Sequence, residues 1–128
     1  MKVSVTIDVP DLEAGLAFFA AAFGFAEKAR PAPGYCVLAR DGAEIALMEK
    51  ADGSSPAPGS EDVRRYGRHW TPVHLDFHVA DFEAALARAI SAGAVCERKF
   101  EGGAHPPVAC CSDPFGHGFC LIGPPPGA

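Results

Sequence analysis

Apolar and polar residues alternate in two stretches of the chain, over residues 3–9 and 73–79. A period of two is typical of a β-strand that buries one face and exposes the other. Each stretch is followed by an aspartate, Asp11 or Asp81, and then by apolar residues at helical spacing. Aspartate is a preferred residue at the start of a helix. The pattern therefore predicts a strand–helix unit that occurs twice, seventy positions apart.

Three further strands follow the helix in each copy. In the first copy we expect the helix and these strands over 12–23, 25–30, 35–39 and 43–48. In the second copy we expect them over 82–92, 95–100, 108–112 and 117–122. Pro31 should end the strand before it, and Asp41-Gly42 predicts a two-residue hairpin turn. The order β-α-β-β-β, repeated, predicts an α+β fold: two βαβββ modules in a pseudo-twofold arrangement, with mixed, curved sheets around a central cleft and helices on the outer faces.

The stretch between the two copies is rich in Ala, Gly, Pro and Ser over 51–60, and polar and basic over 61–70. We place module 1 at 1–50, a linker at 51–71 and module 2 at 72–123 of a single domain, 1–128. The basic part has two interpretations: a clamp for a carboxylate or phosphate, or a solvated linker or subunit contact. Its arginines and its tryptophan are Arg64, Arg65, Arg68 and Trp70.

Composition narrows the class of partner. Hydrophobic residues make up 48% of the chain and charged residues 21%, which is ordinary for a globular domain. The net charge of −5 gives no reason to expect nucleic acid or an anionic membrane surface as a partner. No apolar run approaches the roughly 20 residues of a membrane helix. We therefore expect a cytoplasmic protein whose partner is a small molecule.

The five cysteines do not form a recognisable framework. Their number is odd and none has CxxC spacing, so the sequence predicts neither a set of disulfides nor a zinc knuckle. Free cysteine usually behaves as a small apolar residue, and we expect most of these side chains to be reduced and buried in strands.

Several short motifs occur in an order that is specific to one fold. They are Val9-Pro10-Asp11-Leu12, Phe18-Phe19, Phe23-Gly24-Phe25, His74, Val79-Ala80-Asp81 and Asp113-Pro114-Phe115-Gly116. In this order they resemble the vicinal oxygen chelate superfamily, which includes glyoxalases, extradiol dioxygenases, epimerases, fosfomycin-resistance enzymes and bleomycin-binding proteins. The resemblance covers almost the whole chain and implies a homodimer. Fold alone does not give function in so diverse a group.

The resemblance also implies where a metal would be held. In the metal-dependent members, two side chains from each module hold one divalent ion, and the matching positions here are Ser4, Ala46, His74 and Cys120. Only His74 is of the family's ligand type. Serine is a poor ligand, alanine has no donor, and the thiol replaces the carboxylate that the family carries at the position of Cys120. We therefore expect no resident metal. The alternative is a displaced divalent-metal site that includes His74 and Glu44, with Asp76 and Cys120.

The polar faces of the strands predict a ligand pocket. It would be lined by Ser4, Thr6, Asp8, Glu44, Ala46, His74, Asp76, His78 and Cys120. His74 is expected to exchange a hydrogen bond with the ligand, or else to be a structural histidine. Cys120 beside His74 is either a reactive thiol, the pair then being catalytic, or a small residue that fills space.

Three functions follow from these residues. The first is a metal-independent protein of the bleomycin-resistance type, which binds a small amphipathic molecule in the cleft between the modules. The second is a metal-dependent lyase, isomerase or dioxygenase of the glyoxalase type with a displaced ligand set. The third is a metal-free enzyme that uses His74 as a general base. We favour the first because the defining chelate is missing and nothing equally specific replaces it.

Overall fold

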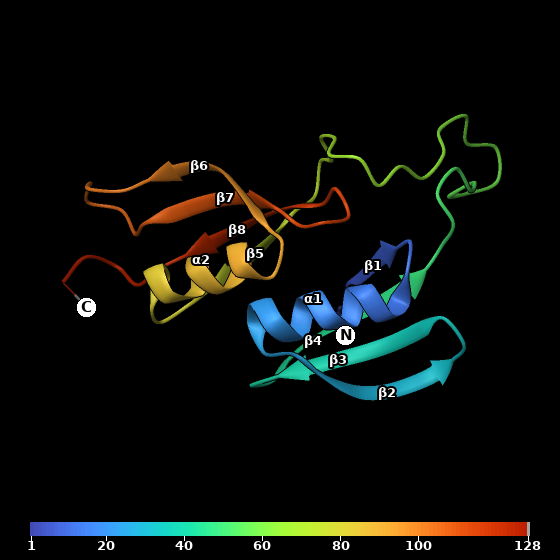
Figure 1. Cartoon of the computed structure of the whole chain (residues 1–128), viewed down its shortest axis with the longest axis horizontal. Coiled ribbons are helices and arrows are strands. Elements are labelled where there is room, and N and C mark those ends of the chain that lie inside the picture. Colours follow the sequence, from blue (N-terminus) through green and yellow to red (C-terminus); the bar gives the residue numbers. More distant parts are fainter. Residues whose placement is uncertain (128) are drawn as a thin grey trace. The chain divides into compact units, whose positions relative to one another are not determined.

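The computed structural model describes residues 1–127. The chain forms two compact units, Met1–Tyr66 and a second unit that begins at Gly67. Each unit consists of one helix and one four-stranded sheet (Figure 1). The predicted α+β class and the duplicated βαβββ module are confirmed. Among residues 1–127, no helix is both long enough and apolar enough to cross a membrane.

The first unit follows the predicted order. Its elements are β1 (Thr6–Val9), α1 (Leu12–Phe23), β2 (Ala26–Ala32), β3 (Tyr35–Arg40) and β4 (Ala43–Glu49). The strands lie in the order β1-β4-β3-β2. β1 is parallel to β4, and the other neighbours are antiparallel. The first strand of the module therefore pairs with the last.

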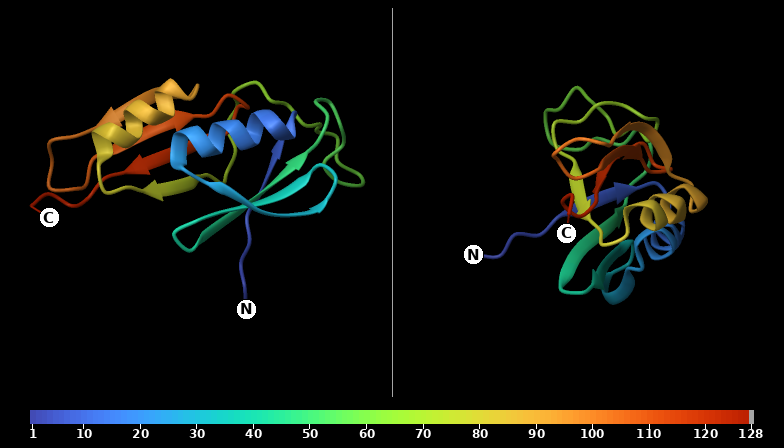
Figure 2. Two further views of the ribbon diagram at one scale, coloured as in Figure 1. Left: turned by 60° about the horizontal axis from the view of Figure 1, so that its bottom comes forward. Right: turned by 90° about the vertical axis from the view of Figure 1, so that its left-hand side faces the viewer.

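The second unit repeats this topology. Its elements are β5 (Leu75–His78), α2 (Phe82–Ser91), β6 (Val95–Phe100), β7 (Val108–Ser112) and β8 (Gly118–Ile122). The order is β5-β8-β7-β6, with β5 parallel to β8. The helix of each unit lies against one face of its own sheet (Figure 2). The other face of each sheet is therefore not covered by the helix of its own unit.

The two helices begin in the same way. The carboxylate of Asp11 accepts a hydrogen bond from the backbone N–H of Ala14 at 3.0 Å, and Asp81 accepts one from Ala84 at 3.1 Å. α1 has a second acceptor, because Glu49 Oε2 accepts a bond from the N–H of Leu12 at 2.8 Å. Backbone N–H groups in the first turn have no partner within the helix, so these carboxylates stabilise the helix starts.

The core of each unit lies between its helix and its sheet. In the first unit, Val9 and Leu47 are fully buried, and a Cβ atom on Gly15 of α1 would come within 3.0 Å of Leu47. In the second unit, Leu121 and Ala89 are fully buried. Val9 of the first alternating strand thus faces α1, and alternation directs Thr6 and Asp8 to the other face of the sheet.

The first strand of each module is shorter than its alternation predicts. β1 and β5 begin at Thr6 and Leu75, although the pattern starts at Val3 and Val73. Val3 and Val73 are 77% and 75% exposed, so nothing covers this end of either strand. β2, in contrast, continues through Pro31 to Ala32. It is an edge strand, where a residue without an N–H group is tolerated.

Candidate functional site

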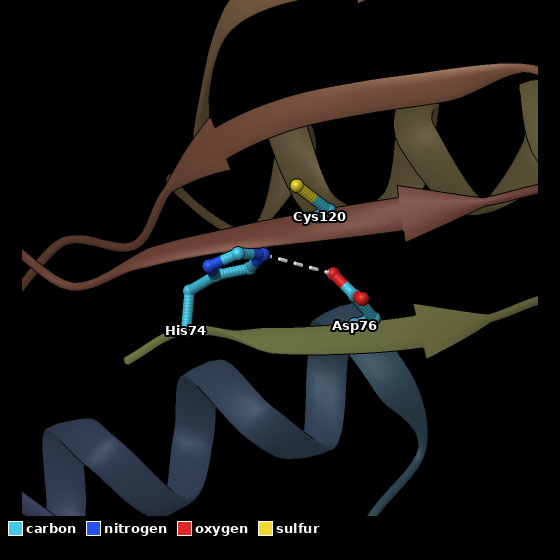
Figure 3. A group of neighbouring side chains, drawn as sticks. All are labelled: His74, Asp76 and Cys120. Carbon is cyan, nitrogen blue, oxygen red and sulfur yellow. Dashed lines mark ion pairs between the residues drawn. The ribbon is translucent and has the colours of Figure 1, made fainter. Parts of the chain in front are cut away.

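Three side chains with metal-binding or acid–base chemistry meet on the polar face of the second sheet (Figure 3). Asp76 and Cys120 are direct partners across the parallel strands β5 and β8. His74 precedes β5, and its Nε2 atom lies 3.2 Å from Oδ1 of Asp76. One donor atom from each residue lies within 4.8 Å of the others. The structure therefore brings together three of the nine residues predicted to line the pocket.

The alternation of β5 explains this grouping. Leu75 and Phe77 point to the opposite face from Asp76, and the ring of Phe77 packs edge-on against Phe119 at 5.9 Å. Because side chains alternate along a strand, burying the apolar pair directs His74 and Asp76 to the polar face. The parallel pairing with β8 then places Cys120 beside them.

The thiol of Cys120 is held in its neutral form. Burial raises its pKa to about 12, with further contributions from the hydrogen bond to Cys110 and from the negative charge of Asp76. The Cys120 thiol donates to the sulfur of Cys110 at 3.7 Å. Since the thiolate is the nucleophile and the metal ligand, this environment works against both roles at neutral pH.

A cavity of about 190 Å³ adjoins these residues in the second unit. Its lining includes Arg68, Trp70, Thr71, His74, Glu97 and Cys120. Trp70 is 81% exposed, an unusual state for a large aromatic side chain. The cavity is smaller than the roughly 300–1,000 Å³ of typical ligand pockets. It combines one aromatic surface with several hydrogen-bonding groups.

Arg68 is already paired inside this cavity. Its guanidinium donates to both carboxylate oxygens of Glu97, at 2.8 and 3.0 Å, and this lowers the pKa of Glu97. The guanidinium also lies directly against Gly118, where a Cβ atom would come within 2.8 Å of it. Arg68 thus lines the cavity with its charge neutralised, which weakens the clamp interpretation for this residue.

Arg64 is paired with a predicted pocket residue. Its Nε donates to Asp8 Oδ2 at 2.7 Å, and Nη1 donates to the carbonyl of Ser55 at 2.8 Å. The hydroxyl of Tyr66 donates to the carbonyl of Lys50 at 2.7 Å. Residues 51–66, predicted as linker, therefore fold onto the first unit. Arg65 is exposed, and its Nη1 lies 3.5 Å from Oδ1 of Asp62.

The remaining predicted residues are described within their own units. In the first unit, Thr6 pairs with Ala46, which is 4% exposed, and Ser4 is exposed ahead of β1. Glu44 is bonded to Lys28 at 2.6 Å, which lowers the pKa of its carboxyl group. In the second unit, His78 is exposed and lies opposite Ile122. The pairing of Glu44 with His74 stays a prediction, as does the shared cleft.

Sequence reasoning missed Cys110 and Glu97, both of which line the cavity. The position of Cys110 could have been predicted from the turn at residues 113–116, because this turn joins the two strands of a hairpin. A hairpin closed by Ser112 and Gly118 places Cys110 opposite Cys120. The cysteines are also less buried than predicted: Cys36 and Cys111 are buried, whereas Cys96, Cys110 and Cys120 are half-buried.

A family model described as a glyoxalase-like domain matches residues 4–122. The chain belongs to the glyoxalase-like domain family. The predicted resemblance to the vicinal oxygen chelate superfamily is thereby confirmed. No curated protein matches the sequence.

Solved structures share this glyoxalase-like fold at low sequence identity. The genomically encoded fosfomycin resistance protein FosX from Listeria monocytogenes, complexed with Mn(II) and 1S,2S-dihydroxypropylphosphonic acid, is 18% identical, with a TM-score of 0.71. That match covers 95% of this chain and 88% of the other. A glyoxalase/bleomycin resistance protein/dioxygenase family enzyme from Burkholderia phytofirmans is 21% identical, covers 94% and 95%, and has a TM-score of 0.68. A glyoxalase-related enzyme from Fulvimarina pelagi is 20% identical, and the TM-score is 0.68. That match covers 97% of this chain and 88% of the other.

The four positions implied for a metal in glyoxalase-like proteins do not fit one here. Ala46 is buried and has no donor atom, and Ser4 is exposed outside the sheet. Cys120 holds its proton at neutral pH. A divalent ion of the harder type prefers carboxylate and imidazole ligands, and of these only His74 stands at an expected position.

Proposed function

We propose that the protein binds a small amphipathic molecule on the polar face of its second sheet, without a resident metal and without catalysing a reaction. The observation that carries this proposal is the cavity lined by Trp70 and by the polar groups of His74, Thr71 and Glu97. An exposed aromatic ring beside a few hydrogen-bonding groups suits a ligand with one apolar and one polar part.

His74 is the polar group best placed to orient such a ligand. Its side chain is 52% exposed, and one ring nitrogen is engaged by Asp76. The other ring nitrogen remains available for a hydrogen bond, as donor or acceptor according to the tautomer. Cys120 contributes a neutral, polarisable surface beside it.

The proposal is tested by fluorescence, because Trp70 is the only tryptophan of the chain. Anilinonaphthalene sulfonate, an amphipathic dye, should accept energy from Trp70 on binding. His74→Ala should weaken binding by about 0.5–1.5 kcal/mol, the net worth of one hydrogen bond. Cys120→Ser should have little effect. The exposed His78→Ala is the matched control and should bind like the parent. Equal affinity of the His74 and His78 variants would contradict the proposed site.

A metal-dependent lyase, isomerase or dioxygenase is the second candidate. It is favoured by the proximity of His74, Asp76 and Cys120, whose donor atoms lie within 4.8 Å of one another. An imidazole, a carboxylate and a thiol would suit a borderline ion such as Zn²⁺ better than Mn²⁺. The raised pKa of Cys120 opposes it, because a bound ion must first displace the thiol proton.

A metal-free enzyme is the third candidate, with His74 as general base. The observation in its favour is Asp76, whose carboxylate lies 3.2 Å from Nε2 and orients the ring. An oriented imidazole is the usual form of a histidine base. A homodimer and a cytoplasmic location remain part of the proposal.

A further inference from the structure

Two half-buried cysteines face each other across the last hairpin of the second unit. Cys110 of β7 and Cys120 of β8 are direct partners in the antiparallel register. Their sulfur atoms lie 3.7 Å apart, joined by an S–H···S hydrogen bond. Both residues also line the 190 Å³ cavity beside His74. The pair is therefore close and lies beside a cavity.

The backbone spacing of this pair suits a covalent link. Residues directly opposite in an antiparallel pair have Cα atoms about 4.5–5.5 Å apart. Disulfides form over Cα separations of about 4.4–6.8 Å. Bringing the sulfurs from 3.7 Å to bonding distance thus requires side-chain rotation and no rearrangement of the strands.

A second cysteine pair in the same sheet serves as an internal comparison. Cys96 of β6 and Cys111 of β7 are also register partners. Cys111 also lines the cavity, but its side chain is only 1% exposed. An external reagent reaches a half-buried thiol at a cavity far more readily than a fully buried one. Both thiols of the Cys110–Cys120 pair are thus half-buried, whereas the Cys96–Cys111 pair contains one buried thiol.

We infer that Cys110 and Cys120 form a reversible disulfide when the protein meets a low-molecular-weight disulfide such as oxidised glutathione. One cysteine loses its proton, and its thiolate attacks a sulfur of the reagent and expels one glutathione thiolate. The second cysteine, as thiolate, attacks the mixed disulfide and expels the other. Two electrons pass to the reagent, and the two thiol protons end on two molecules of reduced glutathione.

The bond would change the polar face of the sheet. Cys120 would lose its S–H donor and its ability to become a thiolate, so it would no longer be a metal ligand or a nucleophile. His74 and Asp76 would remain. The inference concerns the thiol pair alone and stands whether or not the proposed ligand is correct.

The test is oxidation of the full, folded chain with oxidised glutathione in mildly alkaline buffer. Free thiols are then alkylated, and the linked peptides are mapped by tandem mass spectrometry. We expect a Cys110–Cys120 link, with the protein lighter by two hydrogen atoms, and its loss on addition of dithiothreitol. A link between Cys96 and Cys111, or glutathione adducts without any internal link, would overturn the inference.

Serine variants distinguish the two neighbouring cysteines of β7. Cys110→Ser and Cys120→Ser should each abolish the link, and the remaining partner should retain one glutathione. Cys111→Ser is the matched control and should form the link as fully as the parent. Circular dichroism checks that each variant is folded. The peptide map of the parent protein by itself shows whether the Cys110–Cys120 link forms, even if a variant does not fold.

Discussion

At the scale of single residues, Asp76 affects the protonation of Cys120. Burial is the largest cause of the raised pKa of the thiol, but the Asp76 carboxylate adds to it from the neighbouring strand. A negative charge opposes the formation of a second one nearby. The side chains of Asp76 and Cys120 therefore cannot both be ionised without cost.

We predict that Asp76→Asn accelerates alkylation of Cys120 by iodoacetamide at neutral pH several-fold. Removing the carboxylate lowers the pKa of the thiol, which is about 12 in the parent, and so raises the thiolate fraction. In the parent protein the alkylation rate should rise about tenfold for each unit increase in pH, as long as the pH stays below that pKa. The reaction is followed by mass spectrometry of the peptide that contains Cys120.

The exposed Asp62→Asn provides the control, because Asp62 is not among the groups that shift the pKa of Cys120. It should leave the alkylation rate unchanged. A rate for Asp76→Asn that equals the rate for this control would show that the Asp76 carboxylate does not raise the pKa of the thiol.

At the scale of elements, the two modules offer a matched comparison of helix starts. Asp81→Ala removes the side-chain acceptor described for α2, whereas after Asp11→Ala the first turn of α1 still has Glu49. We predict that each change costs about 0.5–2 kcal/mol of unfolding free energy, and that Asp81→Ala costs more. Urea denaturation monitored by circular dichroism measures both. Equal costs would show that Glu49 does not support α1.

Arg64 helps to hold the segment over 51–66 against β1. Arg64 joins Asp8 of β1 to the carbonyl of Ser55, and its side chain is 16% exposed. We predict that Arg64→Ala frees the segment and costs about 1.5–3 kcal/mol, the range for a hydrogen bond to a charged group. Amide hydrogen exchange over 51–66 should rise markedly. Arg65→Ala, next in sequence and exposed, should alter neither measurement.

The regular elements were predictable because local rules decide them. The bounds of α1, β6 and β7 agree with those predicted from spacing and turn residues, since a capping aspartate and a terminal glycine act within a few positions. The exposed ends of the first strands were not predictable in the same way. Alternation at Val3 and Val73 shows which residues share a face, but not whether anything covers that face.

The candidate site was predictable in part for a similar reason. The turn at 113–116 sets the register of β7 against β8 and so places Cys110 opposite Cys120. The closeness of Asp76 to Cys120 follows instead from the expected pairing of the module's first strand with its last. The partners of Arg64 and Arg68 were not. An arginine in a polar linker has many carboxylates within reach, and only the folded path of residues 51–70 selects Asp8 and Glu97.

At the scale of the whole molecule, metal content is the property to measure. The one group of three possible metal donors found in residues 1–127 belongs to the second unit. We predict that protein purified without chelator or added metal holds far less than one equivalent of Zn, Ni, Mn or Fe per chain. Elemental analysis after dialysis measures this. A stoichiometric ion that His74→Ala removes would favour the metal-dependent enzyme instead.

The ion pair between Arg64 and Asp8 has a consequence for how this protein can change. In the second unit, a single replacement of Cys120 by glutamate would add a second carboxylate beside His74 and Asp76, at a position where the family resemblance implies one. In the first unit, gaining metal ligands would need several changes at once. A side chain with a donor atom would have to replace Ala46, and a better ligand would have to replace Ser4. The segment that Arg64 holds to β1 through Asp8 would also have to be released. Gaining a metal site would thus require fewer substitutions in the second unit than in the first. A laboratory selection for metal-dependent activity should therefore accumulate its first substitutions in the second unit.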